Sequence, residues 1–243
     1  MSEDSCLTKR LSAFIDLTRA ERTYLADIEE DSRPVKKGEA LPIAETPGKV
    51  GVLDEGWAVA VTRTLRGDRI THVFLPGDIV GLAEIGGTFE GQTLRMQTDG
   101  VVCPFARTEI GRAIRDLPRL AALLLTISGI DQMTLRDRLA FASSLSAEDR
   151  LILFLLDLRV RLALPNVGSG NRFRLPLTQA EIGRAIGASD ITVNKSMQSL
   201  VRRDWLEHDR PYHRLLDRAA MEERVGFVDR YARIDMSWFP RPV

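Results

Sequence analysis

The stretch that decides the fold reads LTQAEIGRAIGASDITVNKSMQSL, from Leu177 to Leu200. Its spacing predicts two short helices joined by a tight turn. Thr178 and Glu181 have the spacing of a capping box, which begins the first helix. Gly187 suits the left-handed residue that ends this helix, and Ser189 can cap the next one. Because these local signals agree, the stretch is predicted to form a helix-turn-helix.

The second predicted helix, residues 189–203, has two chemically different faces. Apolar residues at helix spacing are expected to face inward: Val193, Met197, Leu200 and Val201. Gly183 in the first helix is the small residue that lets the second helix approach closely. The opposite face is polar, and a helix of this shape fits the major groove of DNA. The alternative is a plain helical hairpin whose polar face meets only water.

The polar face supplies side chains suited to base edges and to phosphates. Asn194 and Gln198 can read adenine, and Lys195 can reach guanine or a phosphate. Asp190 can accept a hydrogen bond from cytosine, and Ile191 can touch a thymine methyl group. The remaining candidates would contact the phosphate backbone: Gln179, Ser189, Thr192 and Arg202.

The segment after this motif has the pattern of a wing. Trp205–Glu207 and Leu215–Leu216 are predicted strands, joined by a loop whose His208 and His213 would be near DNA or simply exposed. Residues 172–218 hold nine lysines and arginines against six acids, a net charge of +3, while the whole chain is neutral. A local positive charge is what phosphate binding requires.

The region before this motif is rich in turns. Between residues 33 and 106, Gly-containing turns separate short apolar runs such as Trp57–Thr62, Ile70–Leu75 and Val101–Phe105. Many short strands at near-regular spacing predict a sandwich, roll or barrel. Residues 8–30 are predicted to be helical, with a capping box formed by Thr18 and Glu21.

A long helix is predicted between the two regions, from Pro118 to about Phe141. Its wide apolar stripe could pair with a second copy of the chain or pack on the strands of its own chain, and the pattern alone does not decide. Ser146 is the expected cap of a further helix, whose run Leu151–Leu164 should be buried. Residues 165–170 are predicted to be a turn-rich loop.

The composition limits the classes of function. The chain has 243 residues, of which 44% are hydrophobic and 28% charged, which is typical of a globular protein. No secretory signal or membrane span is expected, and two cysteines indicate a reducing cytoplasm rather than a disulfide framework. The sequence holds no HExxH motif, phosphate-binding glycine loop or Gly-x-Ser-x-Gly motif, so an enzyme is not expected.

Several segments in the same order resemble the Crp/Fnr family of bacterial regulators. They are Lys37-Gly38-Glu39, Gly56-Trp57, the Leu75–Leu82 turn, the stretch from Met133 to Leu155, and Thr192–Leu200. The resemblance implies an α+β fold. Residues 1–110 would be a jelly-roll-like, double-stranded β-roll sensor domain with an N-terminal helix. Residues 111–145 would be a linker and dimerisation helix, 146–218 a winged helix-turn-helix, and 219–243 a helical extension.

The resemblance also allows this sequence to be compared with the residues that bind the known cofactors of the family. The Gly-Glu and Arg-Ser pairs of the cyclic-nucleotide members are missing, since Leu82 follows Gly81 and Arg95 stands without that pattern. Cys103 matches a family cysteine position. Cys6 is the only other cysteine, so a four-cysteine iron–sulfur cluster is excluded within one chain. Cys103 is therefore interpreted as a buried small apolar residue. His72 could ligate haem iron, although a strand histidine is more often structural. No cofactor is therefore expected.

The expected function is a sequence-specific transcription regulator. It would bind a palindromic site on double-stranded DNA as a homodimer, respond to an unidentified small-molecule effector, and contact RNA polymerase if it activates. Ile191 and Lys195 stand where the best-known members have glutamate and arginine, so the half-site is expected to differ from theirs. The alternative is a small-molecule or redox sensing module, with haem as one candidate ligand, whose DNA binding is weak or vestigial.

Overall fold

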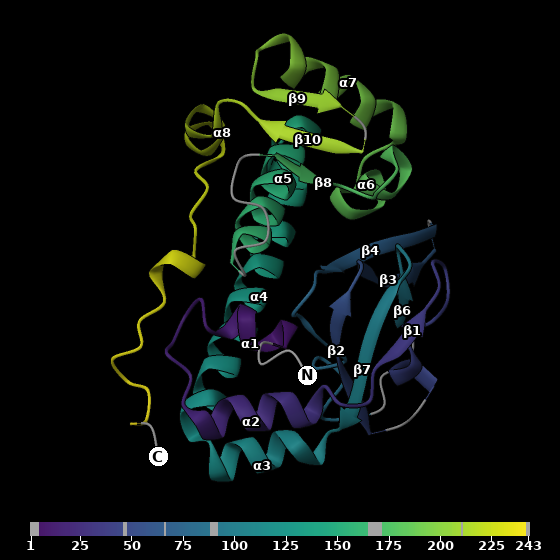
Figure 1. The fold of residues 1–243 in the computed structure, drawn as a ribbon. Helices are drawn as coiled ribbons and strands as arrows, with labels where there is room; N and C mark the ends of the chain where they lie inside the picture. Colours follow the sequence, from purple (N-terminus) through teal and green to yellow (C-terminus); the bar gives the residue numbers. More distant parts are fainter. Residues whose placement is uncertain are drawn as a thin grey trace. The chain divides into compact units, whose positions relative to one another are not determined.

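The computed structural model describes residues 5–45, 48–65, 67–87, 92–164, 172–209 and 211–241. The chain divides into two compact units (Figure 1), residues 1–125 with 237–243, and residues 126–236. The predicted loop at 165–170 lies outside the described residues. Among the described residues no helix is long and apolar enough to cross a membrane.

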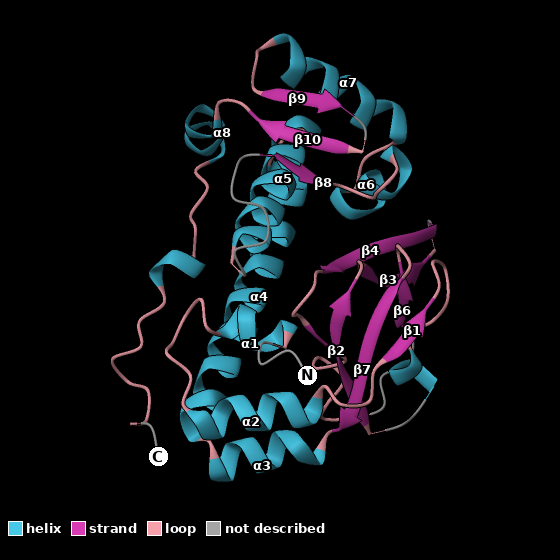
Figure 2. Cartoon of the chain, viewed as in Figure 1, coloured by secondary structure: helices cyan, strands magenta, loops and turns pink. Residues whose placement is uncertain are grey.

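The first unit is built on two antiparallel sheets (Figure 2). One has the order β1-β7-β2-β5 and the other the order β4-β3-β6. The strands are β1 (Arg33–Val35), β2 (Lys49–Glu55), β3 (Ala58–Thr64), β4 (Gly67–Phe74), β5 (Ile79–Val80), β6 (Gln92–Met96) and β7 (Gly100–Ala106). Leu53 and Val102 from the first sheet share one buried core with Ala58 and Met96 from the second. The predicted roll-like fold of short strands is confirmed.

Three helices belong to the same unit: α1 (Cys6–Leu11), α2 (Arg19–Ile28) and α3 (Thr108–Asp116). The prediction of one helix over residues 8–30 was wrong, and the capping box explains why. Thr18 accepts a hydrogen bond from the Glu21 amide and has an extended backbone, with ψ 165°. An N-cap residue has non-helical angles, so the box that begins α2 also prevents α1 from continuing into it.

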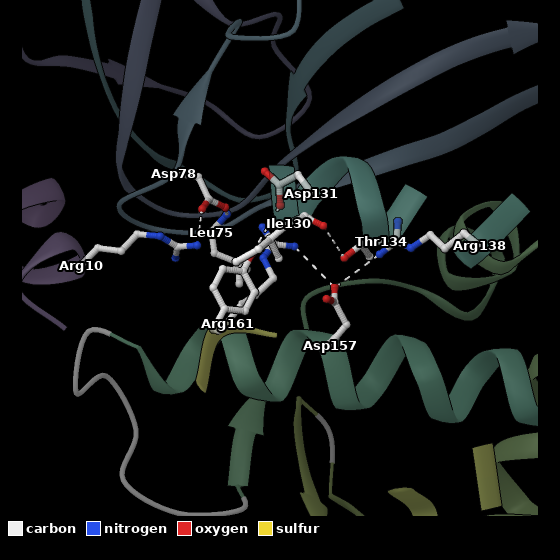
Figure 3. Close-up of polar contacts among 10 residues, drawn as sticks. Arg10, Leu75, Asp78, Ile130, Asp131, Thr134, Arg138, Asp157 and Arg161 are labelled. Carbon is white, nitrogen blue, oxygen red and sulfur yellow. Dashed lines mark hydrogen bonds and ion pairs between the residues drawn. The ribbon is translucent and has the colours of Figure 1, made fainter. Parts of the chain in front are cut away.

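A buried ion pair ties α1 to the turn before β5. Arg10 Nη2 lies 2.6 Å from Asp78 Oδ1, and the two side chains are 3% and 10% exposed (Figure 3). The second carboxylate oxygen of Asp78 accepts from the Leu75 amide at 2.7 Å. A buried charge needs this kind of compensation, because desolvation costs more than a single contact returns.

Helix α4 (Pro118–Ser144) is 27 residues long, and the boundary between the two units falls within it. Pro118 begins it, as predicted, because proline is tolerated in the first turn. Ser146 caps α5 (Ala147–Ala163) by accepting from the Asp149 amide, which also agrees with the prediction. Within the second unit Asp157 on α5 lies 3.4 Å from Arg138 on α4 and 3.7 Å from Arg161 (Figure 3).

The rest of the second unit is a helical pair with a small sheet. Its elements are β8 (Arg172–Arg174), α6 (Gln179–Ile186), α7 (Asp190–Arg202), β9 (Leu206–Asp209), β10 (Tyr212–Leu215) and α8 (Arg218–Val225). The sheet has the order β8-β10-β9 and is antiparallel. The predicted α+β class with a C-terminal winged helix-turn-helix is confirmed.

The chain continues beyond the wing along α4. Gly226, with φ 62°, ends α8. Arg230 then forms a 2.6 Å ion pair with Asp137, and the Tyr231 hydroxyl lies 3.3 Å from Asp131 Oδ1. Within this unit the extension therefore packs on α4, a choice that the sequence left open.

Candidate nucleic-acid interface

The helical pair α6–α7 is held by the local signals that the sequence contains. Thr178 and Glu181 form both hydrogen bonds of a capping box. Gly187 ends α6 with φ 71° and ψ 40°, in the left-handed region. Ser189 Oγ accepts from the Thr192 amide at 3.1 Å and so caps α7. These bonds satisfy amides that a helix terminus would otherwise leave without partners.

Gly183 is needed for a close approach, but its partner differs from the predicted one. A Cβ built on Gly183 would lie 2.5 Å from the carbonyl oxygen of Ala188, in the turn. That oxygen belongs to the backbone and cannot move aside like the end of a flexible side chain. The turn, rather than the body of the second helix, therefore requires the missing side chain.

The inner face of α7 agrees with the predicted spacing except at one position. Val193, Met197 and Leu200 are buried, whereas Val201 is 41% exposed. Eight residues after Val193 the helix has turned about 80° further, which places Val201 at the edge of the face. Ser196 is buried instead.

The outer face of α7 carries the predicted reading residues. Ile191 is 65% exposed, and the other exposed candidates are Ser189, Asp190, Lys195, Gln198 and Arg202. Thr192 and Asn194 are partly buried. The Ser189 and Thr192 hydroxyls lie 2.8 Å apart, so each is already engaged in the cap. The structure brings this set together on one side of a single helix.

Gln179, a predicted phosphate contact, makes a hydrogen bond within the helical pair. From the first position of α6 its Nε2 donates to Asn194 Oδ1 on α7, at 2.9 Å. Two predicted site residues, 15 positions apart in sequence, are thus joined in one amide pair. Sequence spacing gave no sign of this contact.

The side chain of Arg203 contacts other residues of its own unit. Its guanidinium lies 3.5 Å from Glu148 Oε1 and 5.3 Å from the centre of the Trp205 ring. Arg202, which directly precedes it, is exposed, and Arg203 is exposed as well.

The wing differs in detail from the prediction. Its strands β9 and β10 are longer than expected, so His208 and His213 lie in strands, directly opposite each other. His213 is 4% exposed, stacks on Phe173 of β8, and its Nε2 lies 2.7 Å from His208 Nδ1. The expectation that His213 is exposed was wrong, because it did not include the third strand, β8, whose Phe173 packs against this side chain.

Arg150 is an important residue that the sequence reasoning missed. From the first turns of α5 its Nε donates to the Ile186 carbonyl at 2.9 Å, and its Nη1 donates to the Leu145 carbonyl at 2.6 Å. It therefore joins the last turn of α6 to the α4–α5 junction. The only available signal was a charged residue immediately before the strongly apolar run that begins at Leu151.

The first unit does not fit an iron–sulfur cluster of the four-cysteine kind, since the chain has two cysteines. Cys6 is partly buried and Cys103 is buried. Burial, with the nearby Asp54 and Glu29 carboxylates, raises the pKa of each thiol to about 12. Both side chains are thus held as neutral thiols, which agrees with the interpretation of Cys103 as a small apolar residue.

Similarity to known proteins extends over nearly the whole chain. Residues 149–224 match the family model of the Crp-like helix-turn-helix domain. The transcriptional activator protein FnrA of Stutzerimonas stutzeri is 28% identical over 216 residues, covering 87% of each chain. The fumarate and nitrate reduction regulatory protein of Vibrio cholerae is 24% identical over 223 residues, covering 91% of this chain and 89% of that one. Residues 149–224 thus match the Crp-like helix-turn-helix domain, and the chain as a whole is similar to regulators of the Fnr type.

Solved structures of other proteins have the same fold. FixK2 from Bradyrhizobium japonicum superposes with a TM-score of 0.68 and 20% identity, covering 79% of this chain and 95% of that one. A CooA mutant from Carboxydothermus hydrogenoformans gives 0.63 with 16% identity, covering 91% and 96%. Both comparisons cover most of this chain and nearly all of the other.

Proposed function

We propose that the chain is a sequence-specific DNA-binding transcription regulator that inserts α7 into the major groove. The observation that carries this proposal is the outer face of α7. It gathers Asn194, Lys195 and Gln198 on one side of a helix whose other side is buried. In a family of DNA-binding regulators, a solvated hairpin with no ligand has less support than a reading helix.

The residues would have distinct roles in such a complex. Asn194 and Gln198 would read adenine, and Lys195 would reach guanine or a phosphate. Asp190 and Ile191 at the start of α7 would meet cytosine and a thymine methyl group. The phosphate contacts would come from Arg202 and from the groups at the helix starts, namely Gln179, Ser189 and Thr192.

We further propose that the regulator is a homodimer formed through α4. Leu125, Leu135 and Leu139 are 67%, 46% and 79% exposed on this helix. Their spacings of ten and four residues fit the 3.5-residue repeat of a coiled-coil seam. A two-fold dimer would place two α7 helices on half-sites about one helical turn apart, so the expected site is a palindrome.

The remaining assignments follow from this role. Residues 1–110 would form the sensor domain for a small-molecule effector, residues 111–145 the linker and dimer helix, and residues 146–218 the DNA-binding domain. Residues 219–243 would form a C-terminal helical extension. The protein would act in the cytoplasm, without a bound cofactor, and would contact RNA polymerase if it activates transcription.

A DNA titration at several salt concentrations tests the reading face. The wild type should bind its site with a steep salt dependence, because Lys and Arg displace counterions from phosphates. Asn194→Ala and Lys195→Ala should melt at the wild-type temperature yet lose sequence discrimination. If either variant kept wild-type discrimination, the assignment of the reading face would be wrong.

Sedimentation equilibrium tests the dimer. Leu135→Glu with Leu139→Glu should shift the protein toward the monomer, because the charges would lie in an apolar seam. Leu65→Glu is the control, since Leu65 is fully exposed in the turn between β3 and β4 and does not belong to α4. An unchanged dimer in the double variant would contradict the proposed seam.

A further inference from the structure

The amide pair between α6 and α7 gives Asn194 a fixed orientation. Gln179 Nε2 donates to Asn194 Oδ1 at 2.9 Å, and both side chains are partly buried. An asparagine amide has an acceptor oxygen with two lone pairs and a nitrogen with two donors, and the two ends have nearly the same shape. A half-turn of the Asn194 amide alone would replace this hydrogen bond with two donors facing each other. The order of acceptor and donor on Asn194 is therefore coupled to the orientation of the Gln179 amide.

The groups that stay unused in this orientation match one base edge. Gln179 occupies one lone pair of Asn194 Oδ1, which leaves the other lone pair and the two Nδ2 donors. Adenine presents a donor, N6–H, beside an acceptor, N7, in the major groove. An oriented Asn194 can therefore meet adenine with two hydrogen bonds while it keeps its bond to Gln179.

The backbone around Gln179 is independently fixed. Gln179 is the first residue of α6, directly after the N-cap Thr178, whose capping box holds the start of the helix. Arg150 holds the other end of α6 through the Ile186 carbonyl. Because both ends of α6 are anchored, the distance between Gln179 and α7 is a property of the fold, and the amide pair does not depend on a mobile terminus.

We propose that Gln179 is a specificity-determining residue, which acts by orienting the Asn194 amide and not chiefly by binding a phosphate. The inference rests on the proposed DNA-reading function of α7. It assigns the base preference at one position of the half-site to two residues on two helices. Gln179 is then a positioning residue, and Asn194 is the group that touches the base.

The test compares wild type with Gln179→Met, a neutral change that keeps the length of the side chain and removes its amide. Affinities are measured for the preferred duplex and for duplexes changed at one position at a time. A bidentate base contact discriminates by about 1–3 kcal/mol, so losing its orientation should lower the discrimination at one position by roughly tenfold. The affinity for unrelated DNA and the melting temperature should stay within error.

Two further variants make the outcome specific. In an Asn194→Ala background, Gln179→Met should have no additional effect on discrimination, because the oriented group is gone. Gln179→Glu offers acceptors only, so it should turn the Asn194 amide round, exchange the places of its donor and acceptor, and change the adenine preference. Gln198→Met is the matched control, an exposed glutamine on the same face whose loss should affect a different base position.

The possible results distinguish a failure of this inference from a failure of the proposed DNA-reading function. If wild type does not discriminate between duplexes at all, the proposed function fails first. If wild type discriminates but Gln179→Met weakens all duplexes by one factor, Gln179 is a phosphate contact and the inference is wrong. Full additivity of Gln179→Met and Asn194→Ala would also overturn it.

Discussion

On α7 the residues Lys195 and Gln198 are exposed to solvent. In the first unit, by contrast, Arg10 and Asp78 form an ion pair that is almost completely buried. Glu21 and Arg119 repeat the second arrangement, with side chains 3% and 15% exposed. The winged helix-turn-helix thus exposes these polar groups to solvent, while the described part of the β-sheet unit pairs its charged groups with one another. Polar residues that look alike in sequence therefore differ in their exposure between the two units.

The largest expected effect comes from breaking the buried ion pair between Arg10 and Asp78. Arg10→Met would leave the Asp78 carboxylate buried beside an apolar side chain, and removing one partner of a buried pair typically costs about 3–5 kcal/mol. Urea denaturation measures the loss, and hydrogen exchange should place it in residues 5–125. Arg33→Met is the control, because its pair with Asp31 is exposed and its loss should not change stability measurably. Equal effects of the two substitutions would contradict the contrast between buried and exposed pairs.

The next effect concerns the turn of the helix-turn-helix. Gly183→Ala would force a methyl group against the Ala188 carbonyl, and such overpacking costs about 1–3 kcal/mol. The variant should also bind DNA more weakly, because α7 would shift relative to α6.

Gly187→Ala provides the comparison for Gly183, since nothing lies within 4 Å of its added carbon and only the left-handed backbone is strained. Its cost should be about 1–2 kcal/mol. If Gly183→Ala were neutral by urea denaturation, the close approach at the turn would be disproved.

Much of the second unit could be predicted because its signals are local. Thr178, Gly187 and Ser189 act on backbone atoms within four residues of themselves, so their order in the sequence already gives the two helices and the turn. The same local signal was present at Thr18, where a capping box begins α2. Given its full weight, it would have divided the helix expected over residues 8–30 at this residue.

The contacts that could not be predicted join distant segments. Gln179 meets Asn194 across a turn, and Arg150 meets Ile186 from 36 residues away. His213 is buried because β8 pairs with β10, and no sequence pattern indicated that three-residue strand. These positions depend on tertiary packing, which spacing along one element does not contain.

A smaller effect is expected from a helix cap. Thr178→Ala removes the oxygen that accepts from the Glu181 amide, and the loss of an N-cap costs about 1 kcal/mol. Thr178→Ser keeps the hydroxyl and should retain most of the stability. Thermal denaturation distinguishes the two, and an equal loss in both would show that the methyl group, rather than the hydrogen bond, matters.

The smallest effect should appear in the pH dependence of unfolding. Burial alone would raise the pKa of Glu21, but hydrogen bonds from Arg119 and from Thr18 outweigh it and lower that pKa below its ordinary value. The ion pair therefore contributes stability above the ordinary pKa of a glutamate, about 4.3, and this contribution is lost as the pH falls through the lowered pKa. Arg119→Met should reduce the slope of unfolding free energy against pH in that acid range, and an unchanged slope would contradict the assignment.

Selection of bound duplexes from a random DNA pool tests the central claim most directly, with wild type and Asn194→Ala run in parallel. Wild type should enrich a palindrome whose half-sites lie about one helical turn apart. Asn194→Ala should enrich a motif that has lost its preference at one position in each half-site. No enrichment by wild type, or the same motif with the same discrimination from both proteins, would contradict the assignment of α7 as the reading helix.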